Sequence, residues 1–122
     1  MDNQALLVAI VDDEAEVGRA LQRLLRSAGH RAEAFASGQD FLDWLGASAP
    51  DCVLLDIQMA GMSGFEVERQ LNRDRPGLPC IFITASSDAA VLRRVAEQGA
   101  AVLHKPFPDE ELFAALRRAT AG

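Results

Sequence analysis

The chain has 122 residues, the size of one domain, with 49% apolar and 25% charged residues. This ordinary globular composition argues against disorder, and the net charge of −6 argues against nonspecific binding to nucleic acid. No stretch approaches the ~20 apolar residues of a membrane span, and Met1–Gln4 lacks the basic start of a signal peptide. We therefore expect residues 1–122 to form a single cytoplasmic domain without direct contact to membranes or nucleic acid.

Short apolar runs alternate with helical periodicity five times along the chain. The expected strands are Leu6–Val11, Arg31–Ala36, Cys52–Asp56, Pro79–Thr84 and Ala101–His104. The expected helices are Glu14–Ala28, Gly38–Leu45 with Ser37 as N-cap, one that follows Gly64 to Asp74, Asp88–Gln98, and one from Asp109 to the end. Short connections between them predict an α/β fold with five parallel strands covered on both faces.

Polar residues stand where four of the apolar runs stop. They are Asp12, Asp13 and Glu14 after the first run, Asp56 at the end of the third, Thr84 at the end of the fourth, and Lys105 after the fifth. The carboxyl ends of parallel strands form the ligand crevice of an open sheet, so these groups should converge. Carboxylates, a hydroxyl and an ammonium in one patch suit a divalent cation and a phosphoryl group.

The pair Asp12–Asp13 has two interpretations. A helix N-cap followed by a first-turn acid explains one of the two residues. Two carboxylates aimed at the same crevice as Asp56 repel each other, however, unless a cation lies between them. Mg²⁺ fits, because it takes one or two carboxylates, keeps waters and shares oxygens with phosphate.

The other three markers also have a structural alternative each. Asp56 could be a solvated loop acid, or a nucleophile that takes a phosphoryl group as an acyl phosphate and needs no base at pH 7. Thr84 could be an ordinary β-branched strand residue, or a hydroxyl that binds a phosphoryl oxygen. Lys105 could extend to the rim, or pair with Asp56 and later with phosphate, and Pro106 after it allows a cis peptide bond.

The cysteines and histidines carry no site pattern. Cys52 and Cys80 have no metal-ligand spacing and are interpreted as core thiols, which would lie side by side if their strands are neighbours. His30 and His104 are interpreted as surface or packing residues.

The marker segments together resemble the receiver domain of two-component response regulators, the CheY-like superfamily, and within it the FixJ-like branch. The segments are Val11-Asp12-Asp13-Glu14, Leu54-Leu55-Asp56-Ile57-Gln58-Met59, Met62-Ser63-Gly64-Phe65-Glu66, Ile83-Thr84-Ala85 and Lys105-Pro106-Phe107. The resemblance covers nearly the whole chain and implies a doubly wound, flavodoxin-like (βα)5 sheet in the order 2-1-3-4-5.

The resemblance also implies a role for each marker. Asp56 is then the phosphoacceptor, and a histidine kinase is the donor. Asp13, Asp56 and the backbone carbonyl of Gln58 bind Mg²⁺, with Asp12 acting mainly through water. Thr84 and Lys105 hold the phosphoryl group. Such a domain is a signalling switch, not a conventional enzyme, since it catalyses only its own phosphotransfer and dephosphorylation. Gln58 and Ser86 flank the site, and we expect them to influence the phosphoryl lifetime.

Two features depart from the family pattern. Val102 stands where members usually carry Phe or Tyr, so we expect the conformational signal to be muted or rerouted through the loop 85–90. FixJ-like proteins usually carry a DNA-binding output domain, whereas this sequence stops just past the fifth helix. Both a stand-alone regulator and the excised receiver of a longer regulator therefore stay open. Output is expected from the face of the fourth helix, fifth strand and fifth helix, as a docking site or a homodimer.

Two other functions compete with the phosphorylated switch. A receiver-shaped interaction module would work without phosphorylation; Val102 favours it and the complete set of polar markers opposes it. A Mg²⁺-dependent aspartyl phosphatase or dehalogenase-like hydrolase usually has a second acid two residues after the nucleophile, where this chain has Gln58.

Overall fold

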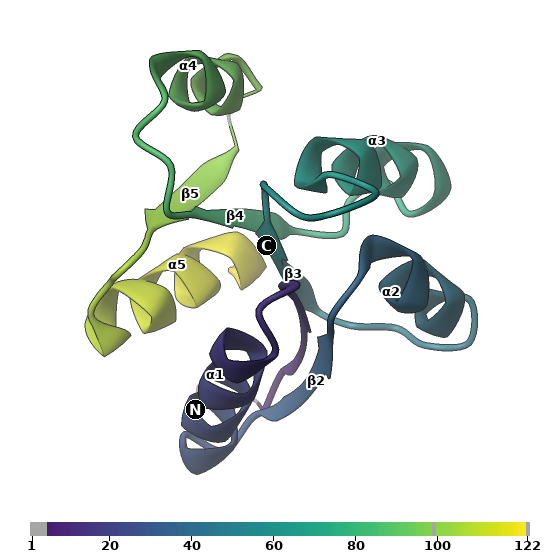
Figure 1. Ribbon diagram of the computed structural model, residues 1–122. Helices are drawn as coiled ribbons and strands as arrows, with labels where there is room; N and C mark the ends of the chain where they lie inside the picture. The colour runs from purple at the N-terminus through teal and green to yellow at the C-terminus, as the bar shows by residue number, and fades with distance from the viewer. Residues whose placement is uncertain (1–4, 99, 122) are drawn as a thin grey trace.

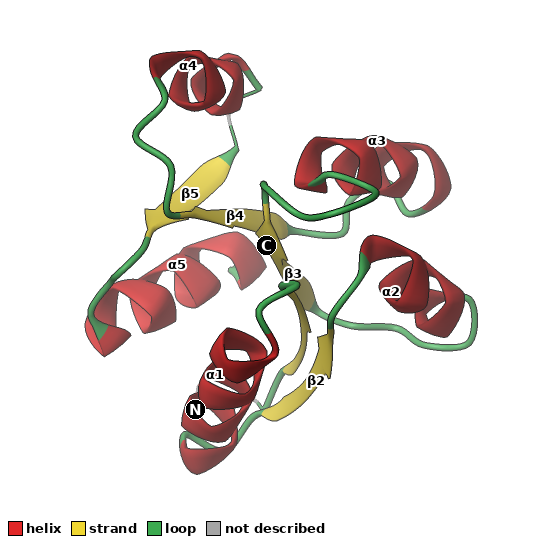
Figure 2. Cartoon of the chain, viewed as in Figure 1, coloured by secondary structure: helices red, strands yellow, loops and turns green. Residues whose placement is uncertain are grey.

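Five strands alternate with five helices in the computed structural model, which describes residues 5–98 and 100–121 (Figure 1). The strands are β1 (Leu7–Val11), β2 (Arg31–Phe35), β3 (Cys52–Asp56), β4 (Cys80–Thr84) and β5 (Ala101–His104). The helices are α1 (Ala15–Ser27), α2 (Gly38–Leu45), α3 (Gly64–Asp74), α4 (Ala89–Glu97) and α5 (Asp109–Thr120) (Figure 2). Every predicted element is present, and no end within the described residues differs from its prediction by more than two residues.

The five strands form one parallel sheet in the order β2-β1-β3-β4-β5, which confirms the predicted topology. In the register of the two central strands, Val11 lies opposite Leu55, so the residues that follow β1 lie beside Asp56 at the end of β3. At the edge, Thr84 lies opposite His104. The topology therefore gathers the ends of β1, β3, β4 and β5 at one rim.

Helices cover both faces of the sheet, and each face has its own core (Figure 1). On one face α1 and α5 supply the buried residues Leu21, Leu25, Leu112, Ala115 and Leu116. On the other face α2, α3 and α4 supply Phe41, Leu45, Phe65, Val67, Leu71 and Val95. All five residues of β3 are buried, as expected for a central parallel strand with both faces covered. No helix within the described ranges has both the length and the apolarity that a bilayer crossing requires.

Capping residues fix where α2 and α3 begin. The Ser37 hydroxyl accepts a hydrogen bond from the Asp40 amide at 3.1 Å, as predicted. Ser63 and Glu66 form a reciprocal capping box at the start of α3, with N···O distances of 2.8 and 3.2 Å. That box starts α3 at Gly64, directly after the loop that follows β3.

The two thiols do not lie side by side, although their strands are neighbours. Cys80 lies opposite Val53, one residue away from Cys52. Because side chains alternate along a strand, Cys52 joins the core under α1 and α5, whereas Cys80 packs against the other core. Both thiols are free, and burial raises their pKa, that of Cys52 to about 12, so they stay protonated at neutral pH. The expectation that the two thiols lie side by side if their strands are neighbours is therefore wrong, because the register places Cys80 opposite Val53 and not opposite Cys52.

The β5 edge of the sheet is loosely covered. Val95 alone among the α4 residues is buried, and Figure 1 shows α4 standing away from β5. On β5 itself, Val102 is 42% exposed while Leu103 on the other face is buried. Thus the position at which the family usually has an aromatic residue holds a short, half-solvated side chain.

Candidate functional site

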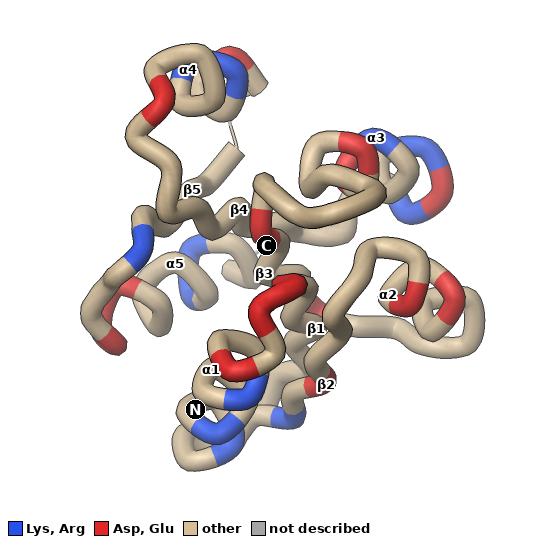
Figure 3. The backbone as a smooth tube through the Cα atoms, in the orientation of Figure 1, with Lys and Arg blue, Asp and Glu red and all other residues tan. Residues whose placement is uncertain are grey.

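Three carboxylates meet at the carboxyl ends of β1 and β3. Oxygens of Asp12, Asp13 and Asp56 all lie within 4.8 Å of one another. Figure 3 shows the acidic segments that follow the two strands beside each other near the centre of the view. Asp12 and Asp56 are buried, whereas Asp13 is exposed and faces the open side of the rim. The strand order therefore brings the predicted acidic residues together although 43 positions separate Asp13 from Asp56.

The Lys105 ammonium is the cation that faces this acidic group in the described part of the chain. Its Nζ lies 2.8 Å from Asp12, 3.5 Å from Glu14 and 3.8 Å from Asp56. The Lys105–Pro106 peptide bond is cis, as the sequence allowed. The Lys105 side chain is only 15% exposed, so it is held at the site and does not extend into solvent.

The carboxylate of Asp12 already has partners for both oxygens. One oxygen accepts the Lys105 ammonium, and the other accepts the Glu14 amide at 2.9 Å. Asp13 instead accepts the Ala60 amide at 3.0 Å and so connects the β1 loop to the β3 loop. Because both Asp12 oxygens are already engaged, the arrangement favours Asp13 for a direct metal contact and Asp12 for an indirect one.

The charges at the site shift the pKa of two groups. Burial and the neighbouring Asp12 charge raise the pKa of Asp56 from 3.8 to about 7, against the opposing effects of Lys105 and the Gln58 backbone. The Asp56 carboxyl is therefore only partly ionised at neutral pH unless a cation binds nearby. Burial lowers the pKa of Lys105, but the Asp12 hydrogen bond and the surrounding carboxylates outweigh burial and raise it.

The donor set fits magnesium on its chemistry. Three carboxylates converge, two of them buried, and a single ammonium does not neutralise them. Hard oxygen ligands with room for water on the exposed side of Asp13 are what Mg²⁺ requires. Gln58 lies in the loop directly after β3, where its backbone carbonyl could add a further oxygen.

Thr84 ends β4 with its side chain buried at the same rim. Its hydroxyl oxygen accepts the Ser86 amide at 2.9 Å. Two further hydrogen bonds order the loop beyond it, from the Asp88 amide to the Ser86 hydroxyl and from the Ala90 amide to the Asp88 carboxylate. The hydroxyl is thus built into an ordered loop that leads from β4 to α4.

The model of the response regulator receiver domain matches residues 8–117. This chain belongs to that family. It is 38% identical to the response regulator protein TodT of Pseudomonas putida over 120 residues, which are 98% of this chain and 53% of TodT. It is 40% identical to the DNA-binding transcriptional regulator NtrC of Klebsiella pneumoniae over 111 residues, 90% of this chain and 24% of NtrC. The chain therefore spans about half or less of these relatives.

A solved receiver structure supports the same assignment. The response regulator receiver protein from Burkholderia phymatum is 45% identical, with a TM-score of 0.83 and 95% of each chain covered. The StyR response regulator is 36% identical, with a TM-score of 0.80, and the match covers 96% of this chain and 60% of StyR. The FixJ-like branch stays a prediction.

The receiver site also contains a close backbone contact that the sequence did not reveal. Gly64 donates its amide to the Ile57 carbonyl at 2.8 Å, and a Cβ atom at position 64 would overlap the Asp56 carbonyl oxygen. The start of α3 therefore lies against the strand end that carries Asp56. The Gly64 in the loop motif was a signal for such a contact, but the sequence does not identify its partner.

An apolar groove next to Lys105 was missed for a different reason. It has a volume of about 630 Å³ and is lined by α1 residues such as Val17 and Leu24 and by Pro106 and Phe107. Val17 and Leu24 follow the helical spacing of the apolar residues in α1, although both are only partly buried. The periodic pattern does not distinguish side chains under the helix from those at its margin.

Proposed function

We propose that this receiver accepts a phosphoryl group on Asp56 from a histidine kinase in a Mg²⁺-dependent reaction. The observation that carries the proposal is the cluster of Asp12, Asp13 and Asp56 with the Lys105 ammonium 3.8 Å from the Asp56 carboxylate. A buried carboxylate with a cation beside it has the electrostatic surroundings that an incoming phosphoryl group needs.

The transfer would use the groups already described. An Asp56 oxygen attacks phosphorus, the bond from phosphorus to the donor nitrogen breaks, and the donor imidazole leaves with that electron pair. Lys105 and the Thr84 hydroxyl bind the phosphoryl oxygens, and Asp13, Asp56 and the Gln58 carbonyl hold Mg²⁺, with Asp12 acting mainly through water. Bound magnesium neutralises charge on the phosphoryl oxygens and keeps Asp56 ionised.

The partners follow from the same site. The groove beside Lys105 offers a helix of a kinase an apolar surface next to the phosphoacceptor. We propose that residues 1–122 act as one cytoplasmic receiver domain and signal through the face of α4, β5 and α5, by docking a partner or by forming a homodimer. The loosely covered β5 edge and the 42% exposure of Val102 support this choice of face. DNA binding is not assigned to this chain itself.

Incubation with acetyl phosphate and Mg²⁺ followed by intact-mass measurement tests the proposal. We expect a gain of one phosphate that is absent in Asp56→Asn and absent when a chelator removes Mg²⁺. An unmodified wild-type mass would refute phosphoacceptance and favour an interaction module. Sustained turnover of a small phosphoester would instead indicate a hydrolase.

A further inference from the structure

We propose that His104 is a positioning residue that couples the phosphoryl site to the β5 surface through the backbone of Ser86. The inference rests on the proposed function, because it concerns how the receiver responds once an anion is bound to Asp56. It assigns to a histidine on β5 a role that the marker residues do not supply.

The backbone of Ser86 is held on both sides of its Cα atom. Its amide donates to the Thr84 hydroxyl oxygen at 2.9 Å, and its carbonyl lies 2.9 Å from Nε2 of His104. A carbonyl oxygen can only accept, so Nε2 carries the proton and donates. The backbone of one residue therefore connects the hydroxyl at the site to an exposed imidazole on the edge strand.

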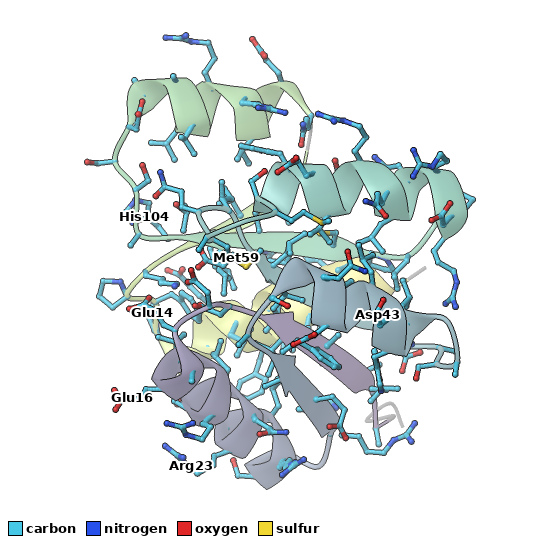
Figure 4. All side chains as sticks on the ribbon, turned by 45° about the vertical axis from the view of Figure 1, so that its right-hand side comes forward. Glu14, Glu16, Arg23, Asp43, Met59 and His104 are labelled. Carbon is cyan, nitrogen blue, oxygen red and sulfur yellow. The ribbon has the colours of Figure 1, made fainter. Side chains whose placement is uncertain are left out.

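The sheet register explains why His104 can make this contact. Thr84 and His104 lie opposite each other on β4 and β5, and alternation places Val102 and His104 on the same face of β5. Leu103 points to the other face, into the core under α1 and α5. His104 thus supplies a ring on the α4 side of β5, two residues beyond the short side chain of Val102. Figure 4 shows His104 at the same rim as Met59 and Glu14.

The link has a consequence for anion binding. The Thr84 oxygen is engaged by the Ser86 amide, and the Ser86 carbonyl is fixed by His104. An anion on Asp56 that draws the Thr84 hydroxyl toward itself moves the oxygen to which the Ser86 amide donates, so the Ser86 backbone must follow it and the bond to His104 lengthens. Because such coupling is reciprocal, the His104 bond weakens anion binding and the bound anion weakens the His104 bond.

The two histidines of the chain provide a direct test. Ring ¹H–¹⁵N spectra of the tag-free chain are recorded with Mg²⁺ before and after addition of beryllofluoride, an anion that mimics a phosphoryl group. We expect the Nε2 signal of His104 to shift and its proton to exchange faster with water. His30, whose Nδ1 accepts the Leu6 amide at 3.1 Å, is the internal control and should not respond.

Two substitutions at position 104 test the energetic coupling. His104→Phe keeps a ring and removes the donor, whereas His104→Gln offers an amide donor near the former Nε2. We expect the apparent dissociation constant for beryllofluoride, measured by ¹⁹F NMR, to fall about fivefold in His104→Phe, the effect of one hydrogen bond of about 1 kcal/mol. His104→Gln should return it toward the wild-type value, and the control His30→Phe should leave it unchanged.

The outcomes separate this inference from the proposed function. A wild-type chain that gains no phosphate from acetyl phosphate refutes the proposed function first. If Asp56 is phosphorylated but the His104 signal is static, or His104→Phe binds beryllofluoride with wild-type or weaker affinity, the proposed function stands and the role of His104 is refuted. A tighter His104→Phe variant that His104→Gln does not reverse would also refute it, because loss of the donor would not be the cause.

Discussion

The pKa of Asp56 predicts an unusual dependence of stability on pH. A carboxyl group whose pKa is higher in the folded than in the unfolded state stabilises the fold only while it is protonated. Its pKa rises here from 3.8 to about 7, so the free energy of unfolding should fall as the pH rises between these values. Asp56→Asn removes the titrating carboxyl group, so in this variant the free energy of unfolding should no longer fall for this reason as the pH rises.

The expected magnitude follows from the two pKa values. At 1.36 kcal/mol per pKa unit, a rise from 3.8 to about 7 amounts to about 4 kcal/mol above pH 8 and about 2 kcal/mol at pH 5.5. The stability gained by Asp56→Asn over the wild type should therefore grow by about 2 kcal/mol between pH 5.5 and pH 8. Desolvation of the carboxylate and repulsion from Asp12 are the physical causes.

Urea denaturation without divalent ions measures this difference. Trp44, the single tryptophan, is packed against Phe35 with ring centroids 5.0 Å apart and reports unfolding by its fluorescence. We expect Mg²⁺ to bind only the folded state, so a concentration of 100 times its dissociation constant should restore about 2.7 kcal/mol to the wild type. Asp43→Asn is the matched control, because Asp43 is exposed and lies away from the acidic rim (Figure 4).

Parallel pH profiles for wild type and Asp56→Asn would refute the reasoning. They would mean that the carboxyl has the same pKa in the folded and unfolded chain, and hence that solvent or Lys105 fully compensates the burial of its charge. An equal change of slope in Asp43→Asn would show that the effect comes from the overall charge and not from the site.

Three further substitutions test other parts of the site. Lys105→Gln leaves the Asp12 carboxylate buried without its cation and should lower the free energy of unfolding in urea by about 3 kcal/mol without Mg²⁺; an unchanged midpoint would show that the pair contributes nothing. Gly64→Ala adds a methyl group that overlaps the Asp56 carbonyl oxygen and should cost about 2 kcal/mol in the same assay, and wild-type stability would contradict the close approach. Because Val102 is half exposed, Val102→Phe should alter the free energy of unfolding by less than about 0.5 kcal/mol. It should enlarge the amide chemical-shift changes that beryllofluoride induces along β5, and unchanged shifts would contradict the expectation that Val102 mutes the conformational signal.

The architecture was predictable because its local signals agree with one another. The run Cys52–Leu55 is apolar throughout, which indicates a strand buried on both faces, and helical spacing follows each strand. Ser37 identifies the start of α2 by a local hydrogen bond. Register was not predictable, because a shift of one residue changes no local pattern, and so the sequence does not reveal that Cys52 and Cys80 lie on opposite faces of the sheet.

The meeting of the polar strand-end residues at one rim was predictable from the sequence, whereas their individual contacts were not. Parallel topology alone brings Asp13, Asp56 and Lys105 to one rim, since each follows a strand of the same sheet. The contact from His104 to the Ser86 carbonyl depends on the path of the loop after β4 and on a backbone acceptor, and a backbone acceptor has no sequence signature. His104 was therefore interpreted as an ordinary surface or packing residue.

The energetics of the acidic rim connect stability with signalling. The fold buries Asp56 where the Asp12 charge raises the cost of ionising it, and Lys105 offsets only part of that repulsion. Any cation that relieves this repulsion must bind the folded state with the energy so released. Ligands at the rim are therefore coupled to the loops that carry these residues, including the loop that Thr84 and His104 share. A site optimised for stability, with one carboxylate replaced by an amide, would lose that coupling.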